Sequence, residues 1–125
     1  MLSLHPLDDE QARTTFNNWS LSPLDGQTIA LNVDGRDVGV LTFTISSDLS
    51  AHIRGVFVLP DSRGKGLGDF LTRSMMNSFT LSNMGVIVDY SDENDYYSKF
   101  GFKQTERGLY VSPEDIVFPS KCGHH

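Results

Sequence analysis

The chain has 125 residues, an ordinary apolar fraction and a formal net charge of -6, so we expect one compact globular domain with its own core. Its ten basic residues are scattered along the chain, which argues against a nucleic-acid partner. The single Cys122 cannot form an intramolecular disulfide, and no apolar run is long enough to span a bilayer, so the sequence predicts a cytoplasmic protein without a membrane partner.

The two ends of the chain differ in what they predict. Residues 1–4 suit a short strand. Residues 6–19 suit a helix, because Pro6 and acidic residues fall in its first turn. Residues 119–125 end in Gly-His-His, which we interpret as a flexible tail or the remnant of a tag rather than as a metal site.

The alternation of apolar residues that is typical of strands begins at Thr28. Residues 29–45 alternate in two runs around Asp34-Gly35, a strong hairpin signal, and a shift of phase indicates a bulge near Gly39. After a turn, residues 51–59 make a third strand, so we expect three consecutive antiparallel strands.

Helical spacing returns after Pro60. The apolar residues of 67–79 recur at helical spacing, and the short apolar run 86–88 suits a strand buried on both faces beside a parallel neighbour. Residues 93–99 can form a short helix that ends at Gly101 in a left-handed cap, and residues 102–111 suit one or two closing strands.

The richest motif joins the third strand to the long helix. Residues 56–68 read Val-Phe-Val-Leu-Pro-Asp-Ser-Arg-Gly-Lys-Gly-Leu-Gly. Glycines let successive N–H groups converge on an anion, and the helix N-terminus adds its partial positive charge, so this segment predicts a phosphate or pyrophosphate cradle. A Walker A loop is excluded because Asp69 follows Gly68, and a dinucleotide fingerprint because the third glycine comes one residue early.

This loop resembles that of the GNAT superfamily of N-acetyltransferases. Arg63, Gly66 and Gly68 match every fixed position of the family's Gln/Arg-x-x-Gly-x-Gly/Ala, and Val58-x-Pro60 also fits. The resemblance implies that loop amides hold the coenzyme A pyrophosphate and that main-chain groups of the preceding strand pair with the pantetheine arm. The residues so implied are Val56, Phe57, Val58, Arg63, Gly64, Lys65, Gly66, Leu67 and Gly68.

A second segment, residues 96–102, is similar to the family's Phe-Tyr-Glu-Lys-Leu-Gly-Phe. Here Tyr97 takes the place of the usual general acid, which protonates the departing thiolate. The alternative is a tyrosine that only packs among neighbouring aromatic rings. The chain departs from the family at Tyr90, where many members have an asparagine, and Ser91 or Asn94 would have to replace that contact.

The general base is less well defined. His52 occupies the position, six residues before Val58, where family members that use a protein base often have a glutamate. A neutral imidazole can take a proton from an ammonium group near pH 7. The alternatives are an exposed strand histidine without a catalytic role, or Asp89 or Glu93 acting through a water molecule.

The resemblance covers about residues 28–111 and implies an α/β fold. That fold has a mixed central sheet with antiparallel N-terminal strands, splayed between its fourth and fifth strands and flanked by helices. We expect a single domain over residues 1–125. Residues 1–27 are shorter than the strand and two helices that usually line the acceptor site, so the acceptor pocket is either open or completed by a second subunit in a homodimer.

The implied activity is transfer of an acetyl group from acetyl-coenzyme A to a primary amine of a small molecule or peptide, by direct attack and without a metal. Two other functions fit the same motifs. One is a sensor that binds acyl-coenzyme A without catalysis, and the other is a partner-binding module that keeps only the fold. Fold alone does not identify the acceptor.

Overall fold

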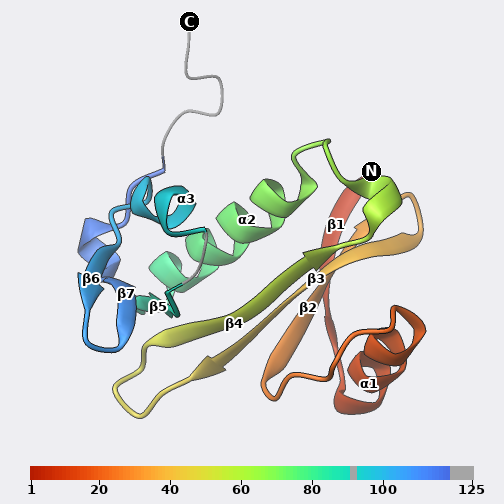
Figure 1. Cartoon of the computed structure of the whole chain (residues 1–125), viewed down its shortest axis with the longest axis horizontal. Coiled ribbons are helices and arrows are strands. Elements are labelled where there is room, and N and C mark those ends of the chain that lie inside the picture. Colours follow the sequence, from red (N-terminus) through yellow and green to blue (C-terminus); the bar gives the residue numbers. More distant parts are fainter. Residues whose placement is uncertain (91–92, 119–125) are drawn as a thin grey trace, which may run out of the picture. The chain divides into compact units, whose positions relative to one another are not determined.

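A computed structural model of the chain describes residues 1–90 and 93–118. Ser91, Cys122 and the tail expected at 119–125 lie outside the described residues. The strands are β1 (Leu2–Leu7), β2 (Gln27–Val33), β3 (Arg36–Ile45), β4 (Ala51–Val58), β5 (Val86–Val88), β6 (Lys103–Thr105) and β7 (Gly108–Val111). The helices are α1 (Asp9–Asn18), α2 (Leu67–Leu81) and α3 (Asn94–Ser98), with single 3-10 turns at Pro60–Ser62 and Pro113–Asp115 (Figure 1).

The hydrogen-bonded order of the strands is β1-β2-β3-β4-β5-β7-β6. β5 is the parallel neighbour of β4 and the remaining pairings are mostly antiparallel, so the expected mixed sheet with flanking helices is confirmed. No helix within the described ranges is long and apolar enough to cross a membrane.

The boundary between β1 and α1 differs from the sequence prediction. β1 continues to Leu7, and the helix begins at Asp9 rather than at Pro6. Pro6 lacks an N–H group but is tolerated because β1 is an edge strand. Asp8 then starts the helix with a capping box, in which its carboxylate accepts from the Gln11 N–H at 2.7 Å and Gln11 accepts from the Asp8 N–H at 3.0 Å.

The hairpin and bulge predicted from the alternation are both present. Asp34 and Gly35 have φ angles of 52° and 92°, the left-handed conformations that a tight hairpin turn requires. The register between β2 and β3 shifts next to Leu31, whose partner is Gly39. The bulge therefore lies where the change of phase in the sequence indicated it.

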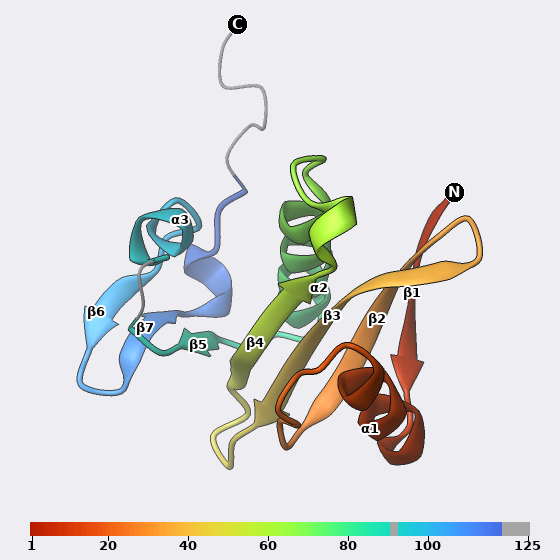
Figure 2. The same cartoon turned by 45° about the vertical axis from the view of Figure 1, so that its right-hand side comes forward.

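The chain forms two compact units, and the first comprises residues 1–44 and 53–75. Its core centres on Phe16 from α1, Ala30 from β2 and Val40 from β3, with Trp19 and Phe57 packed against them. In Figure 2, α1 and the segment that follows it lie over β2 and β3. Helix α1 thus covers the sheet face to which Phe57 of β4 also contributes.

The second unit comprises residues 45–52 and the described residues from Met76 on. β5 is fully buried, as predicted, and pairs with β7 in antiparallel register. The N–H of Ala51 donates to the carbonyl of Gly85 at 2.8 Å, which joins the start of β4 to the segment before β5. After α3 the chain turns at Gly101 with a φ angle of 98°, the left-handed conformation expected there.

Candidate functional site

The segment between β4 and α2 has the backbone that the glycine pattern predicts. Gly64 and Gly66 have φ angles of 81° and 75°, which only glycine adopts without strain. The first helical hydrogen bond runs from the Phe70 N–H to the Gly66 carbonyl at 2.9 Å, so the N–H groups before Phe70 have no partner within the helix. A Cβ atom at Gly64 would meet no atom within 4 Å, so the loop's surface is open there. These features fit an anion such as a pyrophosphate.

The Arg63 side chain anchors this loop to the end of β4. Its Nε donates to the Val58 carbonyl at 2.8 Å, and its guanidinium carbon lies 5.2 Å from the centroid of the Phe57 ring. The Phe57 ring in turn lies 5.9 Å from the Trp19 ring. The arginine at this position therefore acts through its side chain on the protein. Its N–H group donates to the Pro60 carbonyl at 3.3 Å, so the N–H groups suited to an anionic ligand are those that follow Arg63 in the loop.

The three β4 residues expected to contact the pantetheine arm do not all direct their main-chain groups to the same side of the strand. The Leu59 N–H donates to the Val38 carbonyl at 2.8 Å, and the Phe57 carbonyl lies 3.0 Å from where a Cβ at Gly39 would stand. Successive residues of a strand direct their hydrogen-bonding groups to opposite sides. The main chain of Phe57 therefore faces β3, whereas that of Val56 and Val58 faces the other side of the strand.

An ion pair in the first turns of α2 was missed from the sequence. Asp69 Oδ2 accepts from Arg73 Nε at 2.7 Å, and about four fifths of each side chain is buried. A carboxylate suits the first turn of a helix, but it opposes an anion at the same end. Arg73 balances that charge. The spacing of four residues between acid and base was the available signal.

Tyr97 lies on α3 within an aromatic cluster. Its ring centroid is 5.2 Å from that of Tyr96 and 5.5 Å from that of Phe102, both edge to face. Burial, with a smaller contribution from the negative charge of Glu93, raises the pKa of Tyr97 to about 12. The hydroxyl therefore carries its proton at neutral pH, so Tyr97 both packs and can donate a hydrogen bond.

The structure pairs two residues that the sequence presented as alternative bases. His52 Nε2 lies 3.1 Å from Asp89 Oδ1, with 21% of the His52 side chain and 68% of the Asp89 side chain exposed. Beside this pair, the Tyr90 hydroxyl donates to the carbonyl of Thr105 and so holds the end of β5 to β6. Asn94 is the first residue of α3. The glycine loop belongs to the first unit, whereas His52, Asp89 and Tyr97 belong to the second.

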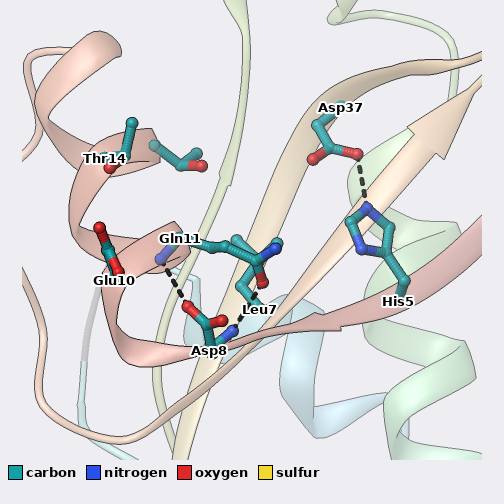
Figure 3. Close-up of a pocket in the computed structure, with 8 residues that line it drawn as sticks. His5, Leu7, Asp8, Glu10, Gln11, Thr14 and Asp37 are labelled. Carbon is teal, nitrogen blue, oxygen red and sulfur yellow. Dashed lines mark hydrogen bonds and ion pairs between the residues drawn. The ribbon is translucent and has the colours of Figure 1, made fainter.

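The first unit also has a polar pocket of about 520 Å³ between β1 and α1 (Figure 3). His5 Nε2 lies 2.7 Å from Asp37 Oδ1, which also accepts from Asn32 Nδ2 at 2.9 Å, so this network ties three strands together. The pocket includes the capping box of α1 but no residue of the glycine loop or β4. The hydrogen bonds of His5, Asp37, Asp8 and Gln11 thus have structural roles in the fold. Among residues 1–90 and 93–118, no group of three or more metal-ligating side chains could hold a metal ion.

Residues 25–104 match the family model of the acetyltransferase (GNAT) domain. Solved structures with the same fold include the ribosomal-protein-S18-alanine N-acetyltransferase of Escherichia coli, with 14% identity, a TM-score of 0.65 and 98% of each chain covered. A GNAT family acetyltransferase from Elizabethkingia anophelis with acetyl-CoA bound has 12% identity and a TM-score of 0.63, over 84% of this chain and 78% of that one. No protein of curated function matches the sequence.

A third structure with this fold corrects one sequence-based expectation. It is a KacTA–DNA complex with 17% identity and a TM-score of 0.66, covering 91% of this chain and 94% of that one. A protein of this fold thus occurs in a complex with DNA. The exclusion of a nucleic-acid partner, which rested on the net charge and the scattered basic residues, is therefore not supported.

We predict that Gly66→Val abolishes binding of coenzyme A while the domain stays folded. A β-branched side chain is strained at a φ angle of 75° and would crowd the N–H groups around it. Isothermal titration should show at least a tenfold loss of affinity. The matched control is Gly35→Val, because Gly35 also has a positive φ of 92° and open space around its Cβ position but lies in the β2–β3 turn. Equal affinities in the two variants would contradict the cradle.

Proposed function

This chain belongs to the GNAT acetyltransferase family, and on that premise we propose that it transfers the acetyl group of acetyl-coenzyme A to a primary amine of a small molecule or peptide. The observation that carries the proposal is the loop between β4 and α2. Gly64 and Gly66 have positive φ angles there, before a helix N-terminus, and the outer side of the loop is open at Gly64. Gly66 and Gly68 stand at the fixed positions of the family's loop.

The donor would be held mainly by backbone groups. We assign the pyrophosphate to the N–H groups of residues 64–68, since the Arg63 N–H donates to the Pro60 carbonyl. We assign the pantetheine arm to the main chain of Val56 and Val58, which faces away from β3. Arg63 stabilises the loop, and Arg73 reduces the repulsion between Asp69 and the anion. Acetyl-coenzyme A supplies the activated thioester.

In the reaction the amine nitrogen forms a bond to the thioester carbonyl carbon, and the carbon–sulfur bond breaks. The ammonium proton passes to a base and the leaving thiolate gains a proton or a hydrogen bond. We assign the base to His52, with Asp89 accepting a hydrogen bond from its Nε2–H and so favouring one tautomer of the ring. Tyr97 is assigned to the thiolate.

The high pKa of Tyr97 limits what this residue contributes. A thiol has a pKa of about 8 to 9, whereas the pKa of Tyr97 is raised to about 12, so full proton transfer from Tyr97 to the thiolate is unfavourable. The contribution expected is a hydrogen bond to the sulfur as negative charge develops on it. Solvent can then protonate the released thiolate.

The proposal predicts that acetyl-coenzyme A and coenzyme A raise the melting temperature of the protein, because a ligand of the native state stabilises it by mass action. Thiol release from acetyl-coenzyme A should then require an added amine. Stabilisation without amine-dependent thiol release would identify a sensor. A chain that neither ligand stabilises would be a partner-binding module with this fold.

Tyr97→Phe should lower kcat by about 10²-fold, at the low end of the range for general acid catalysis, and leave the affinity for acetyl-coenzyme A unchanged. The substitution keeps the ring contacts with Tyr96 and Phe102 and removes only the hydroxyl. A thioester with a more acidic thiol should recover part of the lost rate. Tyr96→Phe, in the same cluster, is the control. If Tyr97→Phe turns over at the wild-type rate while chemistry limits turnover, Tyr97 only packs.

His52→Ala should flatten the acidic limb of the pH profile of kcat/KM. A histidine base must lose its own proton before it can take one from the amine, so the rate falls as acid protonates the ring. Asp89→Asn should lower kcat without unfolding the protein, because an amide can donate to Nε2 and so favour the other tautomer of the ring. Superimposable pH profiles for wild type and His52→Ala would show that water or another group is the general base.

A further inference from the structure

An apolar cavity of about 150 Å³ lies on the α1 side of the first unit. α1, the segment that follows it, β3 and β4 all contribute to its walls. The side chains that make it apolar are Phe16, Leu21, Leu24, Val40 and Phe57. Ser22 and Thr42 also line it, and the Thr42 hydroxyl is hydrogen-bonded to that of Thr28 at 2.9 Å. The cavity therefore suits an apolar group better than a charged or strongly polar one.

Gly55 leaves room for Leu24, which borders the cavity, on the β4 side. A Cβ atom there would stand 2.8 Å from Leu24 Cδ1, so a larger residue would displace the end of the Leu24 side chain and change the shape of the cavity. Glycine weakens the interior of a strand and often marks a close approach by another group. The Leu24 side chain is itself 39% exposed, so its end can move without disturbing the core.

We propose that this cavity receives a compact aliphatic group carried by the acceptor, next to the amine that is acetylated. The inference rests on the proposed function, because the cavity also borders Val56, whose main chain we assigned to the thioester arm. An apolar cavity of this volume holds a molecule about the size of benzene. The substrate class is therefore amines with a branched or linear aliphatic side chain of leucine or methionine size.

Binding of amino-acid amides tests this without requiring turnover. Glycinamide, alaninamide, leucinamide and tryptophanamide are titrated by calorimetry into the full chain saturated with coenzyme A. Because each buried methylene strengthens binding by about fourfold, leucinamide should bind at least tenfold more tightly than alaninamide, and tryptophanamide should show no such gain. Equal affinities for alaninamide and leucinamide would overturn the proposal.

Two variants locate the effect in the cavity. Gly55→Ala should reduce the affinity for leucinamide to that for alaninamide, and Leu24→Ala should raise the affinity for phenylalaninamide by enlarging the space. Leu81→Ala removes a side chain that is 79% exposed at the end of α2 and should change neither value. If Gly55→Ala folds and keeps the leucinamide preference, or if neither variant alters selectivity, the cavity is not the subsite.

The same variants separate this inference from its rival and from the proposed function. If Gly55→Ala weakens hexanoyl-coenzyme A but not leucinamide, the cavity takes the donor's acyl chain and the proposal is wrong. If leucinamide binds with the expected preference but never causes thiol release from acetyl-coenzyme A, the cavity assignment stands and the acetyltransferase proposal fails.

Discussion

The contact between Arg63 and the end of β4 sets the position of the candidate donor site. The glycines before α2 can adopt many conformations, so the loop needs a fixed neighbour if its N–H groups are to be ordered in advance. Arg63 provides one through its bond to the Val58 carbonyl and its contact with the Phe57 ring. Phe57 also touches Trp19, so this anchoring extends to the segment that follows α1. Phe57 thus contacts the candidate donor loop through Arg63 and also lines the candidate acceptor cavity.

The negative charge nearest the candidate anion site is neutralised by an adjacent residue, although the protein as a whole is acidic. The net charge of -6 would disfavour a polyanionic cosubstrate if its acids gathered near the loop. Asp69 is the acid in the first turn of α2, and Arg73 neutralises it from the next turn. Backbone amides carry no charge to be offset elsewhere. The proposed anion site therefore does not require the basic cluster that a nucleic-acid surface needs.

The candidate acid and base of the second unit are not strongly activated by their surroundings. Tyr97 is a weaker acid than an exposed tyrosine because it is buried, and His52 is paired with the largely exposed Asp89. Neither environment strengthens Tyr97 as an acid or His52 as a base to a large extent. Amine attack on a thioester needs little activation, because a thiolate leaves readily, so positioning is expected to contribute more than acid–base strength.

Local sequence was sufficient where backbone conformation depends on near neighbours. The Asp34-Gly35 hairpin, the bulge opposite Leu31 and the positive φ angles of the glycine loop follow from steric limits that act within a few residues. The start of α1 could not be derived in this way. Whether Pro6 begins a helix or ends a strand depends on the pairing of β1 with the distant β2.

The sequence by itself determined the family and the loop, because all the residues of the glycine motif lie in one short segment. Only the tertiary structure decided the rest of the site. It paired His52 with Asp89, 37 residues away, turned the main chain of Phe57 toward β3, and placed Leu24 against Gly55 to shape an apolar cavity. Such contacts join elements whose spacing along the chain has no fixed relation to their distance in space, so no local pattern encodes them.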